Sequence, residues 1–209
     1  MSEIHVVNLS DLIAGRIHLG LRLESRFDVV TQTMEVSEIL AQFLARLSSE
    51  FTAVHYYDCI DNHSRVEPNK SDAMNLESFT RFIPWYLKSR LKDFENLYIH
   101  ENELGEDIIT FTCGTYRVLG VHGDKDNVRN IIERMNNFAK EHFDLILSAH
   151  LHHFSADETC ETIVISNGSL MGTDTYAKNL RLNSKPSQNL IICSDRNPTE
   201  CIYRIQFND

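Results

Sequence analysis

The sequence predicts an α/β fold, a sandwich of mixed β-sheets flanked by helices. Two patterns in its 209 residues lead to this prediction. Strand-like apolar runs alternate with helical runs through residues 3–149, and strand-like runs dominate the remainder of the chain. No internal repeat, low-complexity stretch or linker divides the sequence, so we expect a single domain over residues 1–209.

The composition narrows the class of protein. Apolar residues make up 42% and charged residues 24%, as in ordinary globular domains. No apolar run approaches the roughly 20 residues that cross a bilayer, and the first residues lack a signal-peptide pattern, so we expect a cytoplasmic protein without a membrane partner. The five cysteines form no CxxC pair, which argues against a zinc ribbon. The net charge of −10 argues against nucleic-acid binding by a broad basic surface, but it allows a local metal site that binds phosphate.

The first half of the chain alternates strands and helices. Strands are expected at 3–9 and 51–60. Helices are expected over 28–47 and 75–93, the second with a kink or break at Pro84. The apolar residues expected on one side of the first helix are Val30, Met34, Ile39, Leu40, Phe43, Leu44 and Leu47.

The second half contains one expected helix, over 128–143, and many short strands. The expected strands lie at 96–100, 107–113, 116–121, 144–149, 162–169, 188–194 and 201–207. A long polar segment, 172–188, carries Tyr176 and Arg181 and has no clear periodicity. It could shape a substrate groove, or it could be disordered.

Four of the expected strands end in residue types that bind metal ions. These residues are Asp11, Asn62 with His63, His122, and His150 with His152. Alone, each has an ordinary explanation, since Asp11 could cap a turn and each histidine could lie in a solvated loop. Ligand sites in α/β sheets gather at the carboxyl ends of strands, however, so four such coincidences together indicate a site.

This residue set fits a hydrolytic metal site. A bridging carboxylate can hold two divalent ions about 3.5–4 Å apart. Imidazole nitrogens suit manganese, iron or zinc, and a carboxamide oxygen suits harder ions. His63, next to Asn62, would lie near a bound phosphate, where it could protonate a leaving-group oxygen.

Four short motifs carry a resemblance to a known family. "SDLIAG", "DNHSR", "VHGD" and "AHLHH" resemble the G-D, G-N-H, lone-H and G-H-x-H motifs of calcineurin-like metallophosphoesterases. The branch it resembles is phage-type, usually described as DNA-repair exonuclease-like, and the resemblance covers nearly the whole chain. Three glycines of the family pattern are replaced, by Ser10, Asp61 and Ala149.

The resemblance implies a role for each of these residues. It implies a metallophosphoesterase-like sandwich with Asp11 as bridging ligand, and His63 as the catalytic general acid. The remaining implied metal ligands are Asn62, His122, His150 and His152. One or two divalent ions per chain are implied, Mn²⁺ first, with Fe, Zn, Ni or Mg as alternatives.

The family's D-x-H motif should lie upstream of Asp11, and residues 1–10 contain no D-x-H, so we expect the first βα unit of that fold to be missing. One metal position would then have the full set of Asp11, Asn62, His122 and His150, and the other only Asp11 and His152. Three explanations compete: one metal suffices, another chain completes the site, or His18 or His153 substitutes. A missing strand would expose an apolar sheet edge, so we expect a homo-oligomer or a completing partner chain.

Residues near these motifs are weaker candidates. Arg65 could contact a phosphate oxygen through its planar guanidinium, or could be a surface arginine. His18 could face the same site and bind substrate. Asp124 and Asp126 could orient the histidines, or could be turn and helix-capping residues.

The sequence therefore predicts a metal-dependent phosphoesterase, and the resemblance makes it a phosphodiesterase or nuclease. A metal-bound hydroxide would attack phosphorus while His63 assists departure of the leaving group. The alternative is a non-catalytic or single-metal phage-derived protein that sequesters a phosphorylated ligand or binds a partner protein. In either case we expect a phage or prophage gene in a bacterial host.

Overall fold

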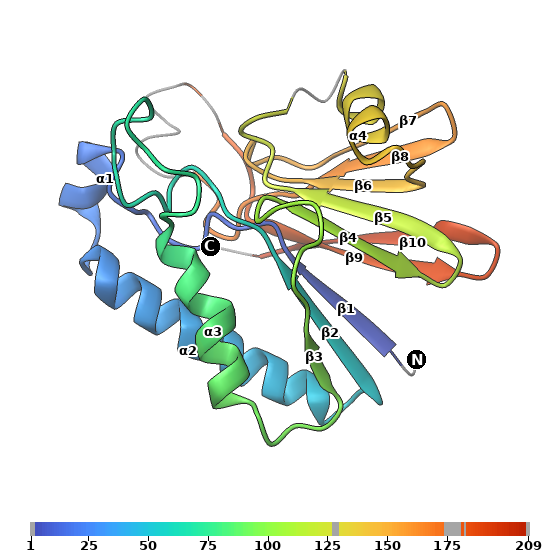
Figure 1. Cartoon of the computed structure of the whole chain (residues 1–209), viewed down its shortest axis with the longest axis horizontal. Helices are drawn as coiled ribbons and strands as arrows, with labels where there is room; N and C mark the ends of the chain where they lie inside the picture. Colours follow the sequence, from blue (N-terminus) through green and yellow to red (C-terminus); the bar gives the residue numbers. More distant parts are fainter. Residues whose placement is uncertain (1–2, 127–129, 174–180, 182, 208–209) are drawn as a thin grey trace. The chain divides into compact units, whose positions relative to one another are not determined.

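The computed structural model describes residues 3–126, 130–173, 181 and 183–207. It confirms the α/β fold class, with mixed sheets flanked by helices (Figure 1). The chain forms two compact units, residues 1–102 and 103–209. Each is described by itself below, and the single domain over 1–209 stays a prediction.

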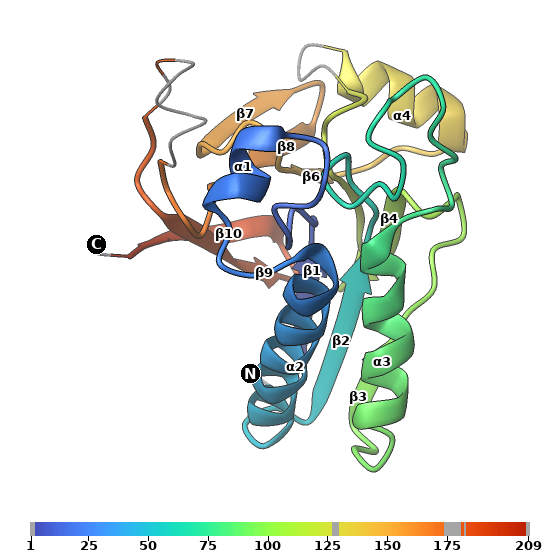
Figure 2. The ribbon, with the colours of Figure 1, turned by 90° about the vertical axis from the view of Figure 1, so that its left-hand side faces the viewer.

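The first unit is built on a three-stranded parallel sheet. Its strands are β1 (Glu3–Asn8), β2 (Ala53–Asp58) and β3 (Leu97–Ile99), in the order β1-β2-β3. Two longer helices cover one face of this sheet, α2 (Val29–Ser48) on the β1 side and α3 (Phe82–Arg90) on the β3 side (Figure 2). Since all three strands are parallel, the loops that follow β1 and β2 leave from the same edge.

Helix α2 begins where predicted, because Asp28 caps it by accepting hydrogen bonds from the amides of Val30 and Thr31. Its expected buried face was right only in part, because Leu44 is buried and Leu40 and Leu47 pack against the core, but the other four residues are exposed. The exposed fraction is 60% for Met34 and 48% for Phe43, and Val30 and Ile39 are also more than half exposed. Besides Leu44, the residues that α2 buries are Thr33, Ser37 and Ala41.

Small side chains explain this choice of face. Ser37 and Ala41 let the α2 backbone approach the sheet closely, which larger side chains would prevent. The buried hydroxyls of Thr33 and Ser37 donate to the carbonyls of Val29 and Thr33, so their burial leaves no donor unsatisfied. The exposed large apolar residues of the helix are Val30, Met34, Ile39 and Phe43.

The helix predicted over 75–93 is shorter than expected. A 3-10 turn, η1 (Phe79–Arg81), leads into α3, and Pro84 lies in the first turn of α3 and does not interrupt a longer helix. Proline is tolerated there because the first amides of a helix have no partner within it. The short helix α1 (Leu19–Glu24) was not predicted.

The other face of the first sheet carries a ladder of stacked rings. His5, His55 and Tyr98 are register partners across β1, β2 and β3, and their neighbouring ring centroids lie 4.9 and 5.0 Å apart. His100 stacks on Tyr57 at 4.4 Å, and its Nε2 lies 2.9 Å from Nδ1 of His55. Neighbouring imidazoles therefore share one surface of the sheet.

The second unit holds a five-stranded mixed sheet in the order β4-β5-β6-β8-β7. Its strands are β4 (Ile108–Cys113), β5 (Tyr116–Val121), β6 (Leu145–Ser148), β7 (Ser155–Thr159) and β8 (Thr162–Ser166). The central three, β5, β6 and β8, are parallel to one another, and the two edge strands are antiparallel to their neighbours. Strand β7 was not predicted, because four of its five residues are exposed and it lacks an apolar alternation.

Helix α4 (Ile131–Ala139) connects β5 to β6 and buries Ile131 and Met135 in the core with Phe143 and Ile146. It is shorter than the predicted 128–143. It ends at Lys140, which takes the left-handed conformation with a φ of 56°. Of the predicted helix, residues 128 and 129 lie outside the described residues.

A two-stranded hairpin, β9 (Ser187–Ser194) and β10 (Asn197–Gln206), ends the described chain. In the polar segment expected to shape a groove, Arg181 is exposed and Tyr176 lies outside the described residues. Among the helices that the structure describes, none has the length and apolar character of a membrane span.

Candidate metal centre

In the first unit, the loop after β1 makes an unusual turn at the candidate ligand Asp11. Ser10 and Asp11 have φ values of 72° and 55°, so two consecutive side-chain-bearing residues occupy the left-handed region. Each residue in this conformation lowers the stability of the fold by on the order of 1–3 kcal/mol, so the conformation persists only where surrounding contacts hold it. One of those contacts is the amide of Ser10, which donates to the Asn8 side chain at 3.0 Å.

Asp61 supplies the other contacts. This buried aspartate lies in the loop after β2, and its Oδ2 accepts hydrogen bonds from the Ser10 hydroxyl and from the Asp11 amide, the latter at 3.0 Å. Its Oδ1 accepts from the Ser64 amide at 2.6 Å. The loop that carries Asp11 and the loop that carries Asn62 and His63 are therefore joined through one carboxylate.

His63 is held in a defined orientation. Its Nδ1 donates to the Ala14 carbonyl at 3.1 Å, which leaves Nε2 as the ring nitrogen for other chemistry. Gly15, with a φ of +69°, packs directly on the backbone of this histidine, and a Cβ there would lie 1.8 Å from the His63 carbonyl oxygen. Gln32 of α2 fixes the same turn by accepting from the amides of Ala14 and Gly15.

His18 and Arg65 lie beside His63 in the first unit. The ring centroids of His18 and His63 are 5.3 Å apart with a 56° tilt. The pKa of His18 is lowered, first by partial burial and then by the nearby His63 and Arg65. The Arg65 guanidinium donates to the Pro68 carbonyl at 3.0 Å. This grouping agrees with the expected neighbourhood, and the substrate-binding roles of His18 and Arg65 stay predictions.

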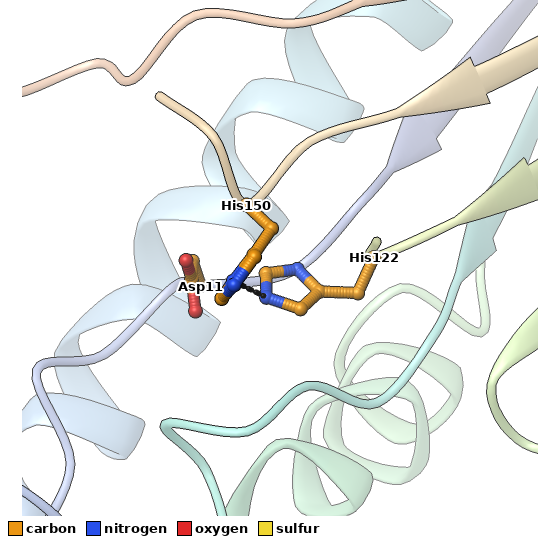
Figure 3. Close-up of side chains that lie close together, drawn as sticks. All are labelled: Asp11, His122 and His150. Atoms are coloured by element: carbon orange, nitrogen blue, oxygen red, sulfur yellow. Dashed lines mark hydrogen bonds between the residues drawn. The ribbon is translucent and has the colours of Figure 1, made fainter. Parts of the chain in front are cut away.

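In the second unit, His122 and His150 form a close pair (Figure 3). They follow the adjacent parallel strands β5 and β6, and the Ala149 amide donates to the His122 carbonyl at 2.9 Å. His150 Nδ1 lies 3.2 Å from His122 Nε2, and His122 is only 2% exposed. Gly123 permits this approach, since a Cβ there would lie 3.3 Å from the Ala149 carbonyl oxygen.

The pair has the spacing of two ligands on one ion. Imidazole nitrogens bind zinc at roughly 2.0–2.1 Å, so two of them on adjacent positions lie about 2.9–3.4 Å apart. The observed 3.2 Å falls in that range. The same geometry also suits an imidazole–imidazole hydrogen bond, which holds the two side chains in place for an ion. His122 and His150 are therefore a candidate metal site.

The other candidates of the second unit are arranged differently. The ring nitrogens of His152 do not come within 4.8 Å of both His122 and His150. His153 is exposed, and its Nδ1 contacts the Leu151 carbonyl at 3.0 Å. The Asp126 carboxylate pairs with Arg134 of α4 at 3.3 Å, and burial raises its pKa. Asp126 thus serves the turn before α4, as one of the two sequence interpretations expected.

Sequence reasoning missed the residues that hold the loops in place. Asp61 was treated only as a replacement for a motif glycine, and Gln32 and Gly15 were not considered. A signal was present for Asp61, because Ser10 and Asp61 replace two motif glycines with a hydroxyl donor and a carboxylate acceptor.

The chain has a sequence relative among known proteins. No protein-family model matches the chain. The chain is similar to the SPbeta prophage-derived uncharacterized protein YonJ of Bacillus subtilis (strain 168), with 24% identity over 204 residues. The match covers 92% of this chain and 49% of YonJ, so the chain spans about half the length of this relative.

Solved structures with a similar chain path are distant. Vps29 from Entamoeba histolytica complexed with zinc is 13% identical with a TM-score of 0.45, over 100% of both chains. An archaeal phosphodiesterase is 12% identical with a TM-score of 0.46, over 99% of this chain and 100% of that one. Thermotoga maritima protein TM1076 is 12% identical with a TM-score of 0.48, over 97% and 98%. TM-scores below 0.5 do not carry an activity from these proteins to this one.

Proposed function

We propose that this chain is a metal-dependent phosphoesterase, and more narrowly a phosphodiesterase acting on nucleic acid or nucleotides. The observation that carries the proposal is the His122–His150 pair, whose 3.2 Å spacing suits two nitrogens on one divalent ion. The four motifs in family order support the same activity.

The ligand set is proposed to extend beyond this pair. Asp11 and Asn62 would add a carboxylate and a carboxamide oxygen to the two imidazoles, and His152 would serve a second ion. A mixed nitrogen and oxygen set suits Mn²⁺, with iron or zinc as alternatives. A bound ion would neutralise charge on the phosphoryl oxygens and activate a water molecule as the nucleophile.

The chain's own residues would handle the phosphate and the leaving group. Because Nδ1 of His63 is committed to the Ala14 carbonyl, a proton delivered by this histidine must come from Nε2. Arg65 and His18 lie on the same side of the first unit as His63, and would orient a phosphate oxygen.

The test combines metal content with turnover. We expect purified protein loaded with Mn²⁺ to hold one or two ions per chain and to hydrolyse bis-p-nitrophenyl phosphate. His122→Ala should lose metal and activity together, whereas His63→Ala should keep the metal and lose at least about 100-fold in rate. His142→Ala removes an exposed histidine and is the matched control. A wild-type protein that turns over no phosphodiester with any of Mn²⁺, Fe²⁺, Zn²⁺ or Ni²⁺ would contradict the proposal.

A second candidate is a single-metal binding protein without turnover. The His122–His150 pair is compatible with it, because two imidazole nitrogens at this spacing can share one ion. One tightly held ion per chain, together with phosphate binding and no hydrolysis, would support this candidate over the enzyme.

A partner and a setting are part of the proposal. Strand β1 pairs only with β2 among the described residues, so its other edge can accept a further strand from a second copy or from a completing chain. We place the protein in the cytoplasm of a bacterial host, in keeping with its prophage-derived relative. Light scattering at micromolar concentration would show an oligomer, and a monomer would count against self-association.

A further inference from the structure

We infer that Asp61 is a positioning residue that sets the candidate ligand Asp11 and the candidate catalytic His63 in one fixed arrangement. The inference deepens the proposed function and rests on it for the roles of those two residues. The coupling between the two loops is a separate claim, which can be tested without metal or substrate.

The Asp61 carboxylate joins two loops that are far apart in the sequence. The residue is 7% exposed, and both of its carboxylate oxygens are used. Oδ1 accepts from Ser64 within its own loop, which an ordinary local turn would also achieve. Oδ2 accepts from Ser10 and Asp11, about fifty residues earlier in the chain, and no local turn requires those bonds.

The backbone at Ser10 and Asp11 is strained at the point where Asp61 binds it. Ser10 and Asp11 both adopt positive φ values, which L-residues adopt only when surrounding contacts enforce them. The bonds from Asp61 reach the side chain of the first residue and the amide of the second, so they hold the turn at the strained point. A glycine at position 10 would adopt a φ of 72° without strain. Ser10 therefore depends on Asp61 in a way that a glycine would not.

This dependence predicts a rescue. In Asp61→Asn the remaining carbonyl oxygen can keep the bond from Ser64, and the amide group then faces the Asp11 amide, donor against donor. The Asp11 turn should loosen. Adding Ser10→Gly removes the backbone strain at position 10, so the double variant should regain part of the turn that the single variant loses.

Hydrogen exchange followed by mass spectrometry tests the coupling on the metal-free full chain. Asp61→Asn should speed exchange about tenfold in peptides covering residues 10–15, with β1 and β2 unchanged. Ser10→Gly in that background should bring the rate back toward that of the wild type. The matched control is Asp28→Asn, which alters an aspartate that also accepts three hydrogen bonds but lies at the α2 N-terminus. The inference would be overturned if Asp61→Asn left exchange at residues 10–15 unchanged. It would also be overturned if Asp28→Asn sped exchange at residues 10–15 as much as Asp61→Asn does, or if Ser10→Gly brought no rescue.

Metal dependence provides the functional readout. If Asp61 positions the ligand Asp11, Asp61→Asn should raise the half-saturating Mn²⁺ concentration about 10–100-fold, and the rate at saturating Mn²⁺ should largely recover. Ser10→Gly should lower that concentration again in the double variant. A fall in rate that no Mn²⁺ concentration restores would contradict the positioning role. If the wild type shows no hydrolysis, the proposed function fails, and hydrogen exchange still decides whether Asp61 couples the loops.

Discussion

Gly15→Ala should disturb the geometry of the His63 loop and also lower the stability of the fold. The new Cβ would lie 1.8 Å from the His63 carbonyl oxygen and 2.8 Å from its carbonyl carbon, and both of these atoms belong to backbone. The His63 loop or the Gly15 turn would have to move by roughly 1 Å, a displacement that can cost about 100-fold in rate. The positive φ adds strain, so we expect a stability loss of about 2–4 kcal/mol.

Gly20→Ala is the matched control, since nothing lies within 4 Å of a Cβ at that helical glycine. It should stabilise the protein by up to about 1 kcal/mol and leave the rate unchanged. Urea unfolding measures stability, and initial rates with bis-p-nitrophenyl phosphate measure kcat/KM. A Gly15→Ala variant within twofold of the wild-type rate and within about 0.5 kcal/mol of its stability would refute the reasoning.

Three further predictions concern the helix face, the ring ladder and the metal. Ala41→Leu should overpack the α2 interface and cost about 1–3 kcal/mol, whereas Met34→Ala, on an exposed flank, should change the unfolding free energy by less than about 0.5 kcal/mol. Burial and neighbouring histidines lower the pKa of His5 and of His100, so their neutral forms favour the folded state at neutral pH. That stability is fully present above pH 6.5, the pKa of histidine in the unfolded chain, and is lost as the pH falls through the lowered pKa values of the folded state. The urea midpoint of the wild type should therefore fall between pH 7.5 and pH 5, and His100→Gln should make this fall smaller. Chelation with EDTA should lower the melting temperature of the metal-loaded wild type and leave that of His122→Ala unchanged; equal shifts in both would show that the ion binds elsewhere.

The positions of the main elements were predictable, because apolar periodicity reports where a strand or helix runs. The buried face of α2 was predictable only in part, because apolar periodicity favours large residues such as Val30, Met34, Ile39 and Phe43 over small ones. The fold selects Ser37 and Ala41 for closeness of approach, and that preference depends on the neighbouring sheet. Strand β7 escaped prediction for a related reason, since an exposed edge strand has no apolar pattern to detect.

The candidate site was also predictable only in part. The sequence predicted that His122 and His150 each follow a strand, and the structure shows that these strands are adjacent and parallel and that the two histidines pair. Their contact within hydrogen-bonding distance depends on Gly123 and on the positive φ of His150, neither of which a motif specifies. The role of Asp61 depends on a contact across about fifty residues, and such contacts are visible only once the two strands are paired.

The bond between Ser10 and Asp61 has an evolutionary consequence. A lone change of Ser10 to a residue without a hydroxyl leaves the Asp61 carboxylate short of a donor, and a lone change of Asp61 leaves Ser10 in a strained conformation without support. Replacing both by glycine removes both problems at once. Among homologues, positions 10 and 61 should therefore covary, with a hydroxyl and an acid in some lineages, two glycines in others, and mixed pairs rare.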